Sequence, residues 1–230
     1  MNSFYKNKKI LITGATGFKG SWLSLWLKML GAKIYGIGLK PQNKNDLFIK
    51  MNLKKKIKYK FFDIRNKESL EIIFKKFKPS IVFHLAAQPI VTNSYVEPHY
   101  TFDVNILGTA NILELTKKYK CVKSAIFITS DKCYENKEQN RGYREIDEIG
   151  GKDPYSASKA AAEILIRSYR ESFFKKKFNT GIASTRAGNV IGGGDLTQAR
   201  IVPDCIKSLI NKKKILIRNH NSNRPWQHVL

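Results

Sequence analysis

The tripeptide Ser130-Asp131-Lys132 lies 25 residues before Tyr155, and Gly14, Gly17 and Gly20 form a glycine-rich turn far upstream of both. A dinucleotide at the glycines and a tyrosine base are sufficient for oxidation of an alcohol. The added acid and base groups of the tripeptide indicate that oxidation prepares a further step, such as elimination. This combination predicts a dehydratase.

The three glycines follow a strand-like run, Lys9 to Thr13, and open a helix-like stretch. There the backbone turns tightly, approaches a pyrophosphate closely and directs helix N-terminal N–H groups toward it. Glycines also serve ordinary strand-to-helix turns, so the motif alone is weak. Expected dinucleotide contacts in this region come from Gly14, Thr16, Gly17, Phe18 and Gly20, with the Thr13 hydroxyl also near the phosphates.

The adenosine end of a dinucleotide is less well defined. Asp63 and Ile64 suit an adenine edge, because a carboxylate accepts from an exocyclic amine and an aliphatic side chain covers the ring; Asp63 alternatively caps a helix. An acidic residue for the ribose is expected roughly 20 residues past the glycines. Gly38-Leu39-Lys40 stands there instead, and Lys40 suits a 2′-phosphate. These residues leave the choice between NAD and NADP open.

A further strand candidate ends in Leu85-Ala86-Ala87-Gln88, whose small residues let a cofactor lie against the backbone. His84 lies in the same apolar run and is expected to be packed or hydrogen-bonded rather than catalytic. Asn105 precedes a predicted helix. It either caps that helix or fixes the backbone beside the catalytic lysine.

Tyr155 and Lys159 are four positions apart, which places both on one face of a helix. A lysine cation and an oxidised nicotinamide nearby lower the pKa of a tyrosine enough for it to act as a base, and Lys159 also suits the nicotinamide ribose. Ser130 is expected to bind a sugar hydroxyl, while Asp131 and Lys132 supply a proton donor and acceptor. The alternative is a solvent-exposed ion pair in a turn. Cys133 invites covalent catalysis, but no histidine partner is evident.

Short apolar runs alternate with longer helix-like stretches, which is typical of a parallel sheet covered on both faces. Strands are expected at Lys9–Thr13, Lys33–Ile37, Lys58–Phe62, Ile81–Leu85, Ser124–Ile128 and Thr180–Thr185, and helices at Trp22–Leu30, Lys67–Phe77, Asn105–Lys118 and Ala157–Phe173. The pattern predicts a doubly wound, Rossmann-like α/β fold.

The C-terminal region departs from this alternation. After Gly192-Gly193-Gly194, a helix near Pro203–Ile210 and a strand near Lys214–Arg218 indicate the start of a smaller lobe. Residues 1–188 are therefore expected to form the dinucleotide-binding domain, and residues 189–230 part of a substrate-binding lobe.

Composition limits the possible classes. The chain has 230 residues, of which 42% are hydrophobic and 11% aromatic, so we expect a globular fold. Its net charge is +24, but 33 of its 42 basic residues are Lys in short clusters without interleaved aromatics. We interpret most of these lysines as parts of solvated surfaces that attract an anionic substrate, and we do not expect a nucleic-acid partner.

The widely spaced cysteines predict neither disulfides nor a metal site. The absence of long apolar segments predicts a cytoplasmic protein without membrane contact.

Six segments cover nearly the whole chain in order: TGATGFKGSWLSLWL from Thr13, FHLAAQP from Phe83, TSDKCYEN from Thr129, GYREIDEIGGKDPYSASK from Gly142, RAGNVIGGGD from Arg186 and RPWQHV from Arg224. They resemble the extended short-chain dehydrogenase/reductase superfamily, its NAD-dependent epimerase/dehydratase family and, most narrowly, the CDP-glucose 4,6-dehydratases.

The resemblance implies an internal redox cycle on CDP-glucose with NAD, as in deoxysugar biosynthesis. Tyr155 would take the C4 hydroxyl proton as hydride passes to NAD, a base would remove the acidified C5 proton, Asp131 would protonate the departing C6 hydroxyl, and hydride would return to C6. The product would be CDP-4-keto-6-deoxyglucose. Related dTDP-glucose dehydratases carry glutamate where this sequence has Lys132, which can be the C5 base only when neutral. Asn189 and Arg224 would contact the substrate pyrophosphate, and Arg200 the nucleotide side.

The sequence ends at Leu230, whereas family members continue through the substrate lobe. We therefore expect an incomplete nucleotide pocket in a fragment, a truncated reading frame or half of a split protein. Two other functions stay open: a nucleotide-sugar epimerase, which needs the glycine turn and Tyr155 but not Asp131 and Lys132, and a non-catalytic dinucleotide-binding module. A nucleotide-sugar is the expected ligand, and a homo-oligomer is compatible with the sequence.

Overall fold

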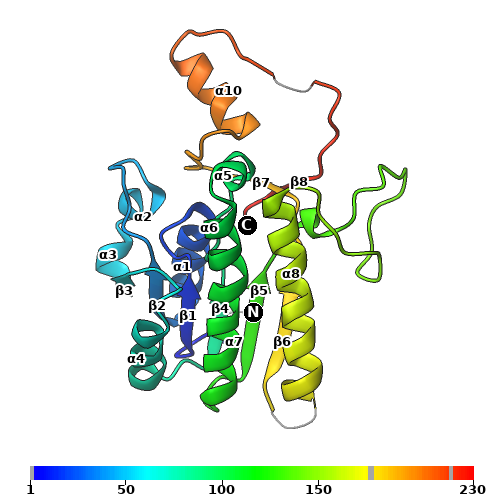
Figure 1. Cartoon of the computed structure of the whole chain (residues 1–230). Helices are drawn as coiled ribbons and strands as arrows, with labels where there is room; N and C mark the ends of the chain where they lie inside the picture. The colour runs from blue at the N-terminus through cyan, green and yellow to red at the C-terminus, as the bar shows by residue number, and fades with distance from the viewer. Residues whose placement is uncertain (1–2, 176–178, 218–219) are drawn as a thin grey trace.

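The computed structural model describes residues 3–175, 179–217 and 220–230, and a six-stranded sheet forms its centre (Figure 1). The strands are β1 (Lys9–Thr13), β2 (Lys33–Gly38), β3 (Lys58–Phe61), β4 (Ile81–His84), β5 (Ser124–Ile128) and β6 (Gly181–Thr185). Their order is β3-β2-β1-β4-β5-β6, and all neighbouring pairs are parallel. The strand order reverses between β1 and β4, where doubly wound sheets bind their ligands.

Helices cover both faces of this sheet. The helices of the described residues are α1 (Phe18–Met29), α2 (Leu47–Lys50), α3 (Leu53–Lys56), α4 (Lys67–Phe77), α5 (Val91–Val96), α6 (Pro98–Phe102), α7 (Gly108–Lys118), α8 (Pro154–Tyr169) and α10 (Ile201–Ile210), with π-helical turns η1 (Asp103–Leu107) and η3 (Arg170–Phe174) and the 3₁₀ turn η2 (Asp131–Cys133). The consecutive residues Ile10, Leu11 and Ile12 are all fully buried. Side chains alternate across a strand, so Ile10 and Ile12 pack in one core and Leu11 in the other.

The six strands of the main sheet are confirmed to within a residue at each end. Three helical segments begin earlier than the apolar spacing predicts. The one expected at Asn105–Lys118 begins at Pro98 and runs through α6, η1 and α7. α1 starts at Phe18 rather than Trp22, and α8 starts at Pro154 rather than Ala157 because Asp153 caps it by accepting from the Ser156 N–H at 3.0 Å. The earlier start of α8 places Tyr155 in its first turn.

The C-terminal region differs more from the prediction. Strands β7 (Asn189–Ile191) and β8 (Trp226–His228) form a separate parallel pair that the sequence pattern did not reveal. The helix near Pro203–Ile210 is confirmed as α10. The predicted strand at Lys214–Arg218 is wrong for residues 214–217, which are irregular and largely exposed because no strand pairs with them; Arg218 lies outside the described residues.

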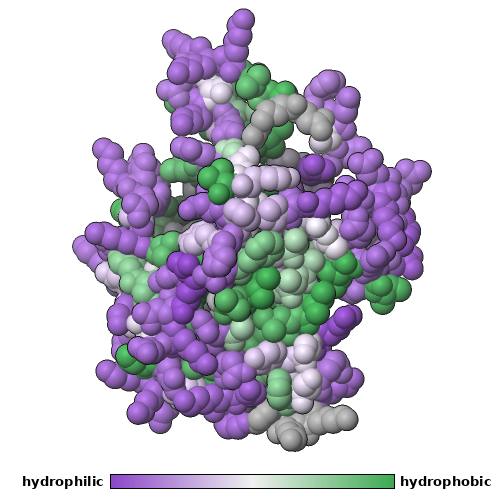
Figure 2. Space-filling view, in the orientation of Figure 1, coloured by the Kyte–Doolittle hydropathy of each residue, from purple (hydrophilic) through white to green (hydrophobic). Residues whose placement is uncertain are grey.

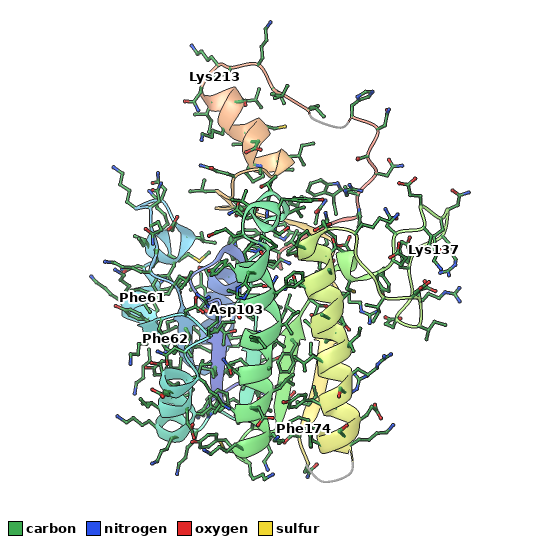
Figure 3. The ribbon with its side chains drawn as sticks, viewed as in Figure 1. Phe61, Phe62, Asp103, Lys137, Phe174 and Lys213 are labelled. Carbon is green, nitrogen blue, oxygen red and sulfur yellow. The ribbon has the colours of Figure 1, made fainter. Side chains whose placement is uncertain are left out.

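α10 projects from the end of the sheet and contains no buried residue (Figure 1). Hydrophobic side chains appear near the top of the space-filling view, where α10 lies, and a larger hydrophobic area covers the middle of the same face, where Figure 1 shows α7 and α8 (Figure 2). Lys213, just after α10, and Lys137, in the loop that follows η2, both lie away from the sheet (Figure 3). Among the described helices, none is long and apolar enough to cross a membrane.

Candidate active site

The glycine turn between β1 and α1 is fixed by close backbone packing. Gly14 has φ +71°, and a Cβ on it would lie 2.7 Å from the Ala86 amide nitrogen. A Cβ on Gly20 would lie 2.0 Å from the Gly14 carbonyl oxygen. Gly17 is exposed, and a Cβ there would have only one neighbour, the Gly14 oxygen at 3.4 Å. Gly14 and Gly20 are thus required by the fold, whereas the open space at Gly17 is available to a ligand.

Thr13 and His84 form a buried polar link under this turn. The Thr13 hydroxyl lies 2.7 Å from His84 Nδ1 and accepts from the Ala86 N–H at 3.3 Å, while His84 Nε2 lies 3.0 Å from the Thr109 hydroxyl. The prediction that the Thr13 hydroxyl contacts phosphates is therefore wrong, because the side chain is fully buried in these bonds. His84 is packed and hydrogen-bonded as expected. Burial, followed by the charge of Lys159, lowers its pKa to about 3.

A cavity of about 300 Å³ opens above the turn at the carboxyl ends of the strands. Every predicted cofactor residue lines it except Gln88 and Asn105: Gly14, Thr16, Gly17, Phe18, Gly20, Asp63, Ile64, Leu85, Ala86, Ala87, Tyr155 and Lys159. Asp63 does not cap α4, since Asn66 does so. Its carboxylate instead accepts from the Arg65 backbone N–H and from the Arg65 guanidinium, each at 2.9 Å.

Gln88 and Asn105 do not line this cavity but are buried and hydrogen-bonded to each other next to residues that do. The Asn105 side-chain oxygen accepts from the Gln88 N–H at 2.8 Å, and its amide group donates to the Gln88 carbonyl at 3.2 Å and to the Ser158 hydroxyl at 2.8 Å. Asn105 lies inside the continuous helical segment formed by α6, η1 and α7, so it caps no helix. It fixes the Gln88 backbone and holds the side chain of Ser158, the residue before Lys159, which is compatible with the second of the two sequence-based alternatives.

A second cavity, of about 580 Å³, adjoins the first and contains the predicted substrate residues Ser130, Asp131, Lys132, Asn189, Arg200 and Arg224. Asn189 and Arg224 come together because β7 pairs with β8 and the Asn189 N–H donates to the Pro225 carbonyl at 3.1 Å. Five residues line both cavities: Lys19, Pro89, Thr129, Tyr155 and Arg200. We call this shared set the junction. A ligand in one cavity therefore lies next to a ligand in the other.

Tyr155 and Lys159 are both buried on one face of α8. Burial raises the pKa of Tyr155, and interaction with Ser130 acts in the opposite direction. In the protein alone this tyrosine is thus a weaker acid than the sequence-based argument expected. Burial, followed by the charge of Lys19, lowers the pKa of Lys159 to about 8.

Ser130-Asp131-Lys132 forms a partly buried turn at the end of β5. The Ser130 hydroxyl donates to the Asp131 carboxylate at 3.1 Å and accepts from the Lys132 N–H at 3.3 Å. Within the described ranges no ion pair joins Asp131 to Lys132, so the alternative of a solvent-exposed ion pair is wrong. Cys133 is fully buried, and burial raises its pKa to about 12, which makes it a poor nucleophile.

Two groups near the site were missed by the sequence analysis. Lys19 lines both cavities from the first turn of α1. A cation is unfavourable there because of the helix dipole, so a lysine just after the glycine turn could have been recognised in the sequence as a candidate functional residue. Glu163 follows Lys159 by four residues on the same face of α8 and accepts from Thr129, Ser184 and Arg186. In the part of the chain that the structure describes, no cluster of His, Cys, Asp or Glu could hold a metal ion.

Comparison with known proteins agrees with this geometry. Residues 11–230 match the model of the GDP-mannose 4,6 dehydratase family. The chain is 46% identical to CDP-glucose 4,6-dehydratase of Salmonella typhimurium, over 99% of this chain and 65% of that protein. It is 36% identical to dTDP-D-glucose 4,6-dehydratase of Dictyostelium discoideum, over 94% of this chain and 51% of that protein. The chain thus spans less than two thirds of the length of these curated relatives.

Solved structures share the fold. UDP-glucose 4-epimerase of Thermus thermophilus in complex with NAD superposes with a TM-score of 0.81 at 27% identity, covering 96% of this chain and 70% of that one. UDP-glucose 4-epimerase of Thermotoga maritima with UDP-glucose gives a TM-score of 0.83 at 25% identity, covering 96% of this chain and 69% of that one.

Proposed function

Because the chain belongs to the GDP-mannose 4,6-dehydratase family, we propose that it is an NAD-dependent nucleotide-sugar 4,6-dehydratase that converts CDP-glucose to CDP-4-keto-6-deoxyglucose. Its similarity to the Salmonella CDP-glucose 4,6-dehydratase supports the choice of substrate. Residues 1–188 would bind the dinucleotide, and residues 189–230 would contribute to the substrate site.

One observation carries the proposal: Tyr155 lines both cavities, with Lys159 on the dinucleotide side and Ser130 and Asp131 on the other. A tyrosine at this junction is placed to take a proton from an alcohol whose hydride leaves toward the adjoining cavity. The carboxyl group of Asp131 lies on the substrate side, where a leaving hydroxyl needs a proton. Oxidation alone does not require this second group.

The first cavity fits NAD. Gly17 leaves room for a pyrophosphate, Ala86 and Ala87 expose backbone, and Asp63 with Ile64 lies at the adenine end. The bound dinucleotide would accept and return one hydride. Leu39 lines this cavity whereas Lys40 does not, which favours NAD over NADP.

The residues of the chain would act in sequence. Tyr155, whose pKa is raised by burial and lowered to a smaller extent by its interaction with Ser130, accepts the proton of the C4 hydroxyl. The C4 ketone acidifies the C5 proton, and Asp131 donates its proton to the departing C6 hydroxyl. Asn189 and Arg224 hold the substrate pyrophosphate, and Arg200 lies at the nucleotide side, because guanidinium and amide donors suit phosphate oxygens.

Incubation of stoichiometric amounts of the chain with NAD and CDP-glucose tests the proposal. We expect a 4-keto-6-deoxy sugar by NMR, and calorimetric titration is expected to give tighter binding of NAD than of NADP. A product epimerised at C4 with its C6 hydroxyl intact would identify the alternative function, a nucleotide-sugar epimerase, which the similarity to UDP-glucose 4-epimerases keeps open. Binding of NAD without any turnover would identify a non-catalytic module.

The variant Asp131→Asn separates oxidation from elimination. An amide cannot donate the acidic proton, so we expect NADH to form at the normal rate and to accumulate while loss of the C6 hydroxyl slows by about a hundredfold or more. Absorbance at 340 nm in a single turnover measures both steps. Wild-type turnover in this variant would remove Asp131 from the mechanism.

A further inference from the structure

Lys19 occupies an unusual place at the junction of the two cavities. It lies in the first turn of α1, next to the exposed Gly17, yet its side chain lines the substrate cavity as well as the dinucleotide cavity. Tyr155 and Thr129 line the same junction. The C4 atom of a substrate oxidised by Tyr155 must lie here, and C5 is bonded to it.

The Lys19 ammonium group has no close partner in the described residues: no hydrogen bond or ion pair within 4 Å involves it. The charged groups that act on it come from several elements, namely Arg200 at the start of α10, Asp131 in η2 and Asp195 in the loop before α10. Burial and then Arg200 lower the pKa of Lys19, and the two carboxylates only partly offset them. Its position in the first turn of α1 disfavours positive charge further.

The proposed reaction needs a base at this place. After C4 is oxidised, the C5 proton must pass to a group with a free electron pair, and an amine has one only when it is neutral. Lys132 lines the substrate cavity alone, whereas Lys19 lines the junction beside Tyr155. A tyrosine that has just taken the C4 proton cannot accept a second one.

We propose that Lys19 is a catalytic residue, the amine that takes the C5 proton during elimination; this inference rests on the proposed function. The C–H electron pair becomes the C5–C6 double bond as the C6–O bond breaks. The hydroxyl leaves as water with the proton of Asp131. When hydride returns to C6, the Lys19 ammonium gives its proton back to C5. The C4 hydroxyl proton held by Tyr155 then passes to Asp131 and restores both groups, so the net change is loss of one water.

Lys19→Arg tests this role because it keeps the charge but cannot act as a base. In a single turnover with NAD and CDP-glucose we expect NADH to form and persist, with elimination slowed at least about a hundredfold. Exchange of the C5 proton of CDP-4-keto-6-deoxyglucose in D₂O is expected to slow equally. Lys28→Arg, an exposed position on the same helix, is the matched control and is expected to behave as the unaltered chain.

A second measurement does not depend on activity. With ¹³C-labelled lysine, the NMR signal lost in Lys19→Arg is expected to titrate below 10.5. Removing the charge with Lys19→Met is expected to raise the pKa of Lys159 above about 8, whereas Lys19→Arg leaves it near that value.

The outcomes separate the two proposals. Three results would each overturn the role of Lys19. The first is normal elimination in Lys19→Arg, and the second is a Lys19 pKa at or above 10.5. The third is NADH accumulation in Lys132→Arg but not in Lys19→Arg. If the unaltered chain forms no NADH from any nucleotide-linked glucose, the proposed function is at fault, while the Lys19 titration is still measured independently.

Discussion

At the scale of single residues, the three glycines of the turn after β1 have different physical roles. Gly14 needs its positive φ and its close contact with Ala86, and Gly20 must pass the Gly14 carbonyl. Neither requirement involves a ligand. Gly17 meets no such constraint and is exposed, so the absence of a side chain there serves the approach of a phosphate.

This difference predicts opposite phenotypes for two substitutions. Gly17→Val is expected to keep the melting temperature and weaken NAD binding about a hundredfold or more, roughly 2.7 kcal/mol, because a side chain blocks the pyrophosphate. Gly20→Ala is expected to lower the free energy of unfolding by about 2 kcal/mol, since the clash outweighs the helix propensity gained. Thermal unfolding and calorimetric titration measure the two effects. Equal NAD affinity in Gly17→Val would mean that the glycine only turns the chain.

His84 predicts how stability depends on acid. Its pKa is about 3 in the folded protein and 6.5 in the unfolded chain, so the unfolded state binds more protons between these values. Stability therefore falls as pH drops through this window, by about 2 kcal/mol at pH 5 from this residue alone. In His84→Gln the loss of stability between pH 7 and pH 5 is expected to be smaller by that amount. Urea unfolding at both pH values checks it, and identical losses would contradict it.

At the scale of elements, Glu163 joins α8 to the ends of β5 and β6. Its carboxylate accepts from the Thr129 hydroxyl at 2.5 Å, the Ser184 hydroxyl at 2.9 Å and the Arg186 guanidinium at 2.9 Å. Thr129 directly precedes Ser130, so this carboxylate sets the distance between the strand end that carries Ser130 and the helix that carries Tyr155. Although burial opposes it, the hydrogen bond from Arg186 holds the pKa of Glu163 below its usual value.

Glu163→Gln is expected to lower the free energy of unfolding by about 2 kcal/mol, because it leaves the partly buried Arg186 charge without its counterion. It is also expected to lower the pKa of Lys159, which the Glu163 charge raises. Chemical denaturation and lysine NMR measure these effects. Glu171→Gln breaks the exposed ion pair with Lys175 as the control, and there we expect a change of at most about 0.5 kcal/mol. If both variants lose a similar free energy of unfolding, the hydrogen bonds of Glu163 contribute no more to stability than an exposed ion pair does.

The elements that the sequence predicted well are those whose signal is local. Short apolar runs located β1 to β6 closely, because the central strands β1 and β4 are buried on both faces of the sheet and read as nearly continuous apolar segments. β7 and β8 were missed, since three-residue strands far apart in the chain have no periodicity and form only through their mutual pairing. At Lys214–Ile217 a strand was predicted but is absent. The β propensity of these residues forms no sheet because no other strand pairs with them.

In the candidate site, too, features with a local sequence motif were predicted and features that depend on contacts between distant segments were not. Most residues that the motifs assigned to cofactor and substrate line the two cavities, because the carboxyl ends of parallel strands lie at one edge of the sheet; Gln88 and Asn105 are exceptions. The bonds of Thr13 with His84 and of Asn105 with Gln88 and Ser158 depend on packing between distant segments. For Asn105 the sequence left two roles open, and only the fold decides between them.

At the scale of the whole molecule, α10 and the segment after it carry a group of exposed hydrophobic side chains. Ile206, Leu209 and Ile210 of α10 are 52%, 64% and 75% exposed, and Leu216 is 86% exposed. Part of this surface, including Ile206 and Leu216, lines the substrate cavity, but Leu209 and Ile210 do not. A group of exposed apolar side chains on one helix and the segment after it favours association even in a chain of net charge +24.

We therefore expect the chain to self-associate through α10, more strongly at high salt, because salt screens the repulsion between like-charged copies. The double variant Leu209→Glu with Ile210→Glu is expected to sediment as a monomer at concentrations where the unaltered chain does not, and to keep its NAD affinity, since both residues lie outside the two cavities. Sedimentation velocity over a concentration series measures the effect. Leu107→Glu, which alters the exposed apolar residue preceding α7, is the comparison. If that variant alone becomes monomeric, the contact surface lies on the helical face of the sheet and α10 is not the interface.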